Sequence, residues 1–86
     1  MDVKLQIGDY IRWLYPLGYV DAQRRNYTHG LITEIKYDDE IVDGESLHIV
    51  ETRTNKSFWL STDLLISYGS AEVLRDGEWL LPALGN

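Results

Sequence analysis

Polar and apolar residues alternate with a period of two along much of this chain, in short runs separated by turn-forming residues. Residues 10–15 (Tyr-Ile-Arg-Trp-Leu-Tyr) and 31–37 (Leu-Ile-Thr-Glu-Ile-Lys-Tyr) show the pattern most clearly, and residues 47–52 and 57–61 repeat it. Successive side chains of a strand point to opposite faces of a sheet, so this period predicts half-buried β-strands. The sequence therefore favours a fold made of short strands.

Two hairpins are indicated by their turn residues. Asp76-Gly77 separates the apolar runs 71–75 and 78–81, and Asp-Gly is the strongest short hairpin signal. It sets three cross-strand pairs: Val73 with Leu80, Leu74 with Trp79, and Arg75 with Glu78.

The hairpin between residues 47–52 and 57–61 leaves two registers open. A loop of Thr54 and Asn55 pairs the apolar residues well but places Arg53 opposite Lys56. A loop of Asn55 and Lys56 removes that repulsion and pairs the apolar residues less well.

These elements predict one all-β domain over residues 1–86, an antiparallel barrel of five to six short strands with an additional C-terminal β-hairpin. Residues 61–65 are predicted to form a single helical or 3₁₀ turn, and no segment has a sustained helical period. The core is expected to contain Ile11, Trp13, Ile32, Ile35, Ile49, Phe58, Leu60 and Leu64.

The opening resembles that of SH3-like barrels of the KOW and Tudor kind. Gly8-Asp9 precedes the first predicted strand, Gly30 precedes the second after a long loop, and residues 58–64 are similar to the family's fourth strand and 3₁₀ turn. The pattern also resembles small SH3-like proteins of phage and marine metagenomic origin. The resemblance implies an SH3-like barrel whose first loop binds partners, and the Asp76-Gly77 hairpin exceeds the family's usual five strands.

The charge of the chain limits its partners. Fourteen acidic residues outnumber eight basic ones, giving a formal charge of −6, and Arg24-Arg25 is the only adjacent basic pair. Nucleic acid and anionic membranes are therefore disfavoured relative to proteins, small ligands or cationic partners. No cysteine is present, which excludes disulfides and thiolate zinc sites. We expect a cytoplasmic protein.

The first loop, residues 15–29, holds the predicted binding residues. Tyrosine offers apolar area with a polar tip, and arginine binds carboxylates with two hydrogen bonds. Alternatively, the tyrosines pack the loop onto the barrel and the arginines pair with nearby acids. The predicted binding residues are Tyr15, Tyr19, Arg24, Arg25 and Tyr27.

Other sites are less favoured. An aromatic cage for a methylated cation would need Trp13, Tyr15, Tyr37 and Trp59, yet a small barrel needs such rings in its core. Residues 38–45 contain five carboxylates but do not match a calcium-binding loop. No nucleophile, phosphate-binding loop or metal-ligand spacing is recognisable, so we expect no enzymatic activity, no cofactor and no metal.

The sequence thus predicts a non-catalytic module that binds a protein partner. The alternative is nucleic-acid binding through a face of Arg12, Arg24, Arg25, Lys36 and Tyr27, and a third reading is a small-ligand or ion sensor that uses the acidic segment. Basic side chains gathered on one face would favour nucleic acid, and basic side chains scattered among acids would favour protein. A homodimer or larger assembly through the Asp76-Gly77 hairpin, with Trp79 in the contact, is also expected because that hairpin is apolar on both faces. Alternatively, Pro82 and the final residues fold back over the exposed face and the protein stays monomeric.

Overall fold

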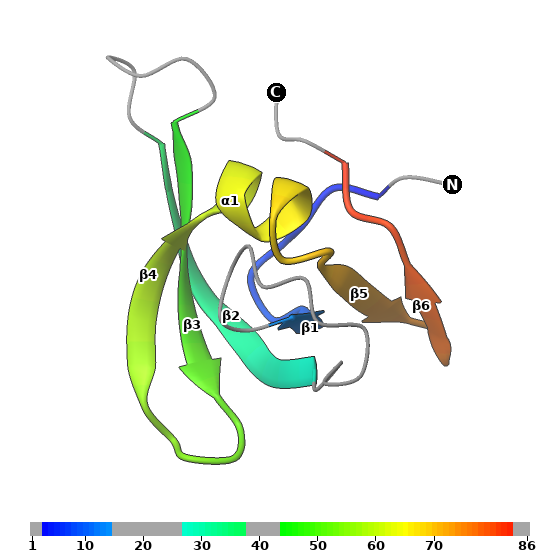
Figure 1. Ribbon diagram of the computed structural model, residues 1–86, viewed down its shortest axis with the longest axis horizontal. Coiled ribbons are helices and arrows are strands. Elements are labelled where there is room, and N and C mark those ends of the chain that lie inside the picture. Colours follow the sequence, from blue (N-terminus) through cyan, green and yellow to red (C-terminus); the bar gives the residue numbers. More distant parts are fainter. Residues whose placement is uncertain (1–2, 15–26, 38–43, 84–86) are drawn as a thin grey trace.

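The computed structural model describes residues 3–14, 27–37 and 44–83. These residues form one antiparallel sheet of six strands and one short helix, shown in Figure 1. The elements in chain order are β1 (Tyr10–Leu14), β2 (Tyr27–Tyr37), β3 (Glu45–Glu51), β4 (Ser57–Ser61), α1 (Thr62–Ser67), β5 (Glu72–Arg75) and β6 (Glu78–Leu80). The predicted all-β class and the six strands are confirmed.

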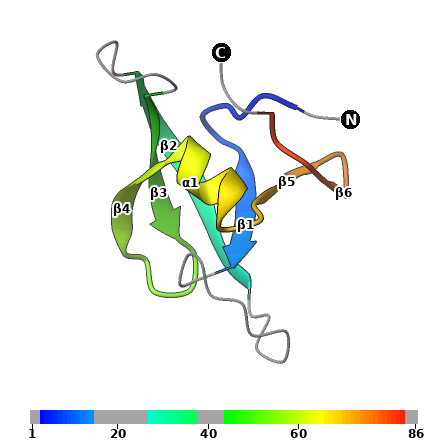
Figure 2. The ribbon, with the colours of Figure 1, turned by 45° about the horizontal axis from the view of Figure 1, so that its top comes forward.

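The strand order in the sheet is β4-β3-β2-β1-β5-β6, so β4 and β6 form its two edges. Strand β2 is the longest strand and pairs with β1 through its first half and with β3 over most of its length. The β2–β3 register shifts at a bulge between Ile32 and Glu34, and a bulge bends the strand that carries it. Figures 1 and 2 show the sheet curling around one core in a barrel-like form, although the sheet is not closed.

The core lies inside this curl and is built mainly from alternate residues of the strands, with Leu5, Leu65 and Ala71 contributed from outside them. It consists of Leu5, Ile11, Trp13, Ile32, Leu47, Ile49, Leu65, Ala71 and Val73. Four of the predicted core residues are therefore confirmed: Ile11, Trp13, Ile32 and Ile49. Three others are half-buried and pack against the core: Ile35, Phe58 and Leu60.

The prediction for Leu64 is wrong. Its side chain is 41% exposed, whereas Leu65 is fully buried. The predicted turn is an α-helix of six residues, and the helical rotation directs Leu65 rather than Leu64 toward the sheet. The amide of Ala71 also donates to the Leu65 carbonyl at 3.1 Å, which anchors this turn above β5.

The two hairpins differ in how well the sequence specified them. The Asp76-Gly77 hairpin has the predicted register, and both turn residues have positive φ angles of 52° and 81°. Neither predicted register of the β3–β4 hairpin is correct, because its loop has four residues, 52–55, and the Glu51 amide donates to the Lys56 carbonyl at 2.8 Å. Asn55 has a positive φ of 62°, whereas a two-residue type I′ turn needs two such residues.

The two ends of the described chain meet beside β6. Val3 forms an isolated parallel bridge with Pro82, and its amide donates to the Leu81 carbonyl at 3.0 Å. The amide of Ala83 donates back to the Val3 carbonyl at 2.6 Å. Among the described residues, no helix is long and apolar enough to cross a membrane.

Candidate functional site

Tyr27 is the one predicted binding residue in the part of the chain that the structure describes. Tyr15, Tyr19, Arg24 and Arg25 lie outside the described residues. Tyr27 begins β2 opposite Leu14, the last residue of β1, and its side chain remains 37% exposed. It therefore marks the point at which the chain returns from the predicted binding loop to the sheet.

Arg12 lies beside Tyr27 on the outer face of the sheet, because the flanking residues Ile11 and Trp13 point into the core. Its Nε and Nη2 atoms donate to Oε1 of Glu72, on β5, at 3.1 and 3.0 Å. Its guanidinium carbon lies 4.5 Å from the Tyr27 ring centre and 4.1 Å from the Trp79 ring centre. The cation is thus held by one carboxylate and the π-faces of two rings.

Two further rings complete this group. Tyr10 stacks on His29 with ring centres 5.7 Å apart, and each of these rings lies 6.0 Å from Trp79. We call the set the Arg12 cluster: Tyr10, Arg12, Tyr27, His29, Glu72 and Trp79. The cluster leaves Trp79 only half-exposed, so the outer face of the C-terminal hairpin is less open than its sequence suggests.

The described members of the aromatic cage, a site that the sequence disfavours, do not come together. Trp13 is fully buried and meets Phe58 edge-on in the core. Trp59 lies on the outer face of β4, where it contacts His48 and where the Lys36 ammonium stands 4.7 Å from its ring centre. Tyr37, at the end of β2, is 62% exposed, and Tyr15 is outside the described residues.

The Arg12 cluster was missed at the sequence level. One signal for the cluster was present in the sequence: the Asp76-Gly77 register pairs Trp79 with Leu74 and so places both side chains on the same face of the hairpin. The pairing of β5 with β1, which brings Glu72 opposite Arg12, could not be recognised from the local sequence.

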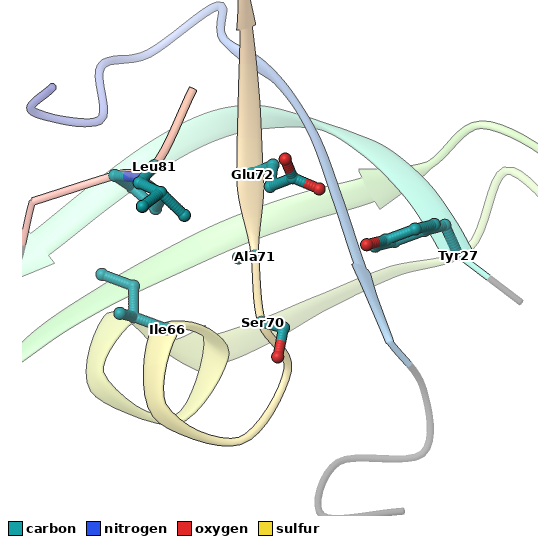
Figure 3. Close-up of a pocket in the computed structure, with 7 residues that line it drawn as sticks. Tyr27, Ile66, Ser70, Ala71, Glu72 and Leu81 are labelled. Carbon is teal, nitrogen blue, oxygen red and sulfur yellow. The ribbon is translucent and has the colours of Figure 1, made fainter. Parts of the chain in front are cut away.

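A pocket of about 420 Å³ adjoins this cluster and shares two of its residues, Tyr27 and Glu72. In Figure 3 the hydroxyl end of Tyr27 and the carboxylate of Glu72 point toward one another across it. We call it the Tyr27 pocket, and its remaining lining residues are Ile66, Ser70, Ala71, Leu81 and Pro82. Glu72 is the only charged residue among the described residues of this lining, which combine one carboxylate, one aromatic ring and an apolar wall.

A second pocket, of about 430 Å³, lies on the other half of the molecule beside β4. We call it the Phe58 pocket, and it is lined by Trp13, Thr28, Glu51, Thr54, Lys56, Phe58, Trp59 and Leu60. Its charged lining consists of one acid and one base, so it offers mainly apolar and aromatic surface.

The described arginines of the sheet are both paired with acids. Besides the Arg12–Glu72 pair, Arg75 binds Asp9 with two hydrogen bonds, Nε to Oδ1 at 2.9 Å and Nη2 to Oδ2 at 2.7 Å. The hydrogen bonds that the Asp9 carboxylate accepts from Arg75 raise the pKa of Arg75 further above its already high value. Arg75 also donates to the Lys4 carbonyl at 2.9 Å, so this pair fastens the N-terminal segment to β5.

Acidic residues do not form a metal centre in the described part of the chain, where no group of three or more His, Cys, Asp or Glu side chains is placed to hold an ion. Of the acidic segment 38–45, residues 38–43 lie outside the described residues. Glu45 is only 4% exposed, and its Oε1 atom has no hydrogen-bond partner among the described residues. Comparisons of the chain with protein-family models, curated proteins and solved structures find no significant match.

Proposed function

We propose that the protein is a non-catalytic interaction module that binds a protein partner through the Tyr27 pocket. The observation that carries the proposal is the pocket itself, in which the one described residue of the predicted site, Tyr27, faces a carboxylate, Glu72. The pocket adjoins the C-terminal end of the predicted binding loop, because that loop returns to the sheet at Tyr27.

The lining of the Tyr27 pocket fits a lysine or arginine side chain from the partner. Such side chains have an apolar stem and a charged head, and the lining combines the apolar residues Ile66, Leu81 and Pro82 with the Glu72 carboxylate. The Arg12 hydrogen bonds are both made to Oε1 of Glu72. The net charge of −6 attracts a basic partner over a longer range.

Nucleic-acid binding remains the alternative, and the described basic side chains support it less. Arg12 is committed to Glu72 and to two rings, and Lys36 stands over Trp59. Arg12 and Lys36 are far apart in the sheet. Arg12 lies opposite His29, and Lys36 follows His29 by seven residues, so about 23 Å of strand separates the two basic positions. This scatter of basic groups among acids and aromatic rings favours a protein partner.

Kinship with SH3-like barrels is also part of the proposal. The order β4-β3-β2-β1-β5, with a short helix between β4 and β5, supports the resemblance that the opening residues suggested. Strand β6 is then an addition to that pattern. We place the protein in the cytoplasm because a chain without cysteine needs no oxidising compartment.

The test is a selection of peptides that bind the full chain from a display library, followed by affinity measurements on variants. We expect basic peptides to be enriched, and Leu81→Lys to weaken their binding by about tenfold because it places a positive charge in the apolar wall, where it repels a lysine or arginine head. Leu64→Lys is the matched control, since Leu64 is also exposed but lines neither pocket described above.

Two results would contradict the proposal. Enriched peptides that bind equally well to the Leu81→Lys variant would show that the pocket is not used. Salt-sensitive binding of duplex DNA at micromolar affinity in about 150 mM salt would favour the nucleic-acid alternative instead.

A further inference from the structure

The two edges of the sheet are protected to very different degrees. Strand β6 has three residues, one of them the charged Glu78, and the chain just after it is hydrogen-bonded to Val3 through Leu81 and Ala83. Trp79 packs into the Arg12 cluster. Short length, charge and covering segments are the features that keep an edge strand from pairing with another chain. The hairpin edge that the sequence suggested for self-association therefore has several of these protections.

Strand β4 has none of these protections in the described structure. Its sequence, Ser-Phe-Trp-Leu-Ser, contains no charge and no proline, and β3 is its only strand partner among the described residues. Figures 1 and 2 both show β4 at the outer rim of the sheet. An uncharged, aromatic edge strand of this kind is a template for pairing with another strand.

The outward backbone groups of β4 follow from its pairing with β3. The Glu51 amide donates to the Lys56 carbonyl, and hydrogen-bonded pairs alternate with non-hydrogen-bonded pairs along an antiparallel ladder. Three residues of β4 therefore direct their N–H and C=O groups away from β3: Ser57, Trp59 and Ser61.

We propose that β4 pairs with β4 of a second copy of this chain, antiparallel and centred on Trp59, to form a symmetric homodimer. In this register Trp59 faces Trp59 of the second copy, and Phe58 faces Leu60 of the second copy. An isologous contact of this kind closes on itself and leaves no further edge to extend.

Charge complementarity identifies the second copy as the occupant. Lys56 precedes β4 and Asp63 follows it, and both side chains are exposed. Antiparallel pairing about Trp59 brings Lys56 of each chain next to the start of α1 in the other chain, where Asp63 lies. Two opposite-charge contacts then form. Strand β4 itself contains no charged residue, so no like charges meet along the paired strands. These contacts offset the repulsion between two chains of charge −6.

Apolar surface at the same edge supports this pairing. Trp59 is 41% exposed, and Phe58 and Leu60 are only half-buried. Leu60 of the second copy would lie beside Phe58, at the Phe58 pocket. Because only five residues pair on each chain, the interface is below the standard size, and we expect a dissociation constant of about 0.01 to 1 mM.

The experiment is sedimentation equilibrium on the full chain from about 10 µM to about 1 mM, where self-association follows mass action. We expect a monomer–dimer equilibrium for the wild type. Lys56→Glu and Asp63→Lys should each raise the dissociation constant about tenfold, because each turns two attractive contacts into repulsive ones. The double variant restores opposite charges and should return the constant to within about threefold of the wild type.

Glu78→Lys, which changes the charge of the other edge strand, is the control and should leave the equilibrium unchanged. Hydrogen exchange gives a second readout, in which protection of the Trp59 amide rises with protein concentration while that of the β3 amides does not. A monomer at every concentration, dissociation by Trp79→Ala but not by the β4 charge variants, or a double variant that does not recover would each overturn the proposal. Peptide binding at the Tyr27 pocket is measured separately, so either proposal can fail alone.

Discussion

The guanidinium carbon of Arg12 lies 4.1 Å from the centre of the Trp79 ring, although β5 separates their two strands in the sheet. The same guanidinium binds Glu72 on the intervening strand. One side chain on β1 therefore fastens both strands of the C-terminal hairpin to the rest of the sheet. This contact connects the stability of the hairpin to the shape of the Tyr27 pocket, because Tyr27 and Glu72 belong to both.

Arg12→Ala should lower the free energy of unfolding by about 1–2 kcal/mol, because it removes two charge-assisted hydrogen bonds and two partly exposed cation–π contacts. Arg12→Lys should recover only part of this loss, since an ammonium cannot form the same planar contacts. Urea denaturation followed by tryptophan fluorescence measures the difference. Arg53→Ala, at an exposed loop position, is the control and should change stability by less than about 0.5 kcal/mol. Equal effects of the two alanine variants would show that the cluster contributes nothing.

Arg75→Lys should lower stability by about 0.5–1 kcal/mol, because lysine cannot form the two-point contact with Asp9. A double-mutant cycle with Asp9→Asn measures the coupling, which should shrink at high salt. The raised pKa of Arg75 gives a stabilisation that is complete at neutral pH and is lost only as the pH rises through that pKa. Arg75 titration should therefore cause no stability change between neutral pH and about pH 9. A coupling energy of zero at low salt would contradict the prediction.

Leu65→Ala and Leu64→Ala form a matched pair on α1. Leu65 is fully buried, so its truncation should cost about 2–5 kcal/mol through lost burial and the resulting cavity. Leu64 is 41% exposed, and its truncation should cost less than about 1 kcal/mol. Thermal unfolding of the two variants decides between them, and a larger effect at Leu64 would mean that α1 is rotated by one residue.

Gly30→Ala should destabilise the protein by about 1–3 kcal/mol through overpacking. A Cβ atom at this position would lie 2.5 Å from Cγ2 of Ile49 and 3.0 Å from the Val50 carbonyl oxygen. Neither the buried Ile49 side chain nor the backbone can move away easily. Glu34→Ala, at an exposed position of the same strand, is the control. Unchanged denaturation midpoints in both variants would show that β2 and β3 pack less closely than this.

Local sequence signals determined the parts of the fold that depend on neighbouring residues. Period-two alternation fixed which faces of β1, β3 and β4 point inward, because side chains of a strand alternate whatever their partners are. Asp76-Gly77 fixed the register of its hairpin, since few dipeptides adopt two successive positive φ angles. Tyr27 could be singled out because it ends a long loop rich in tyrosine and arginine.

The tertiary structure decided what depends on contacts between distant segments. The sequence pattern predicts that Gly30 precedes a strand, but Gly30 lies inside β2. A glycine is required there because the close approach of Ile49 leaves no room for a side chain. Leu65 rather than Leu64 is buried because the orientation of α1 is set by the sheet beneath it. The Arg12 cluster exists because β5 pairs with β1 and brings Glu72 opposite Arg12, which is 60 residues away in the sequence. This long-range pairing contributes nothing to the local sequence pattern around either residue. The sequence by itself thus determined strands and one turn, and long-range packing decided the pocket and the sheet edges.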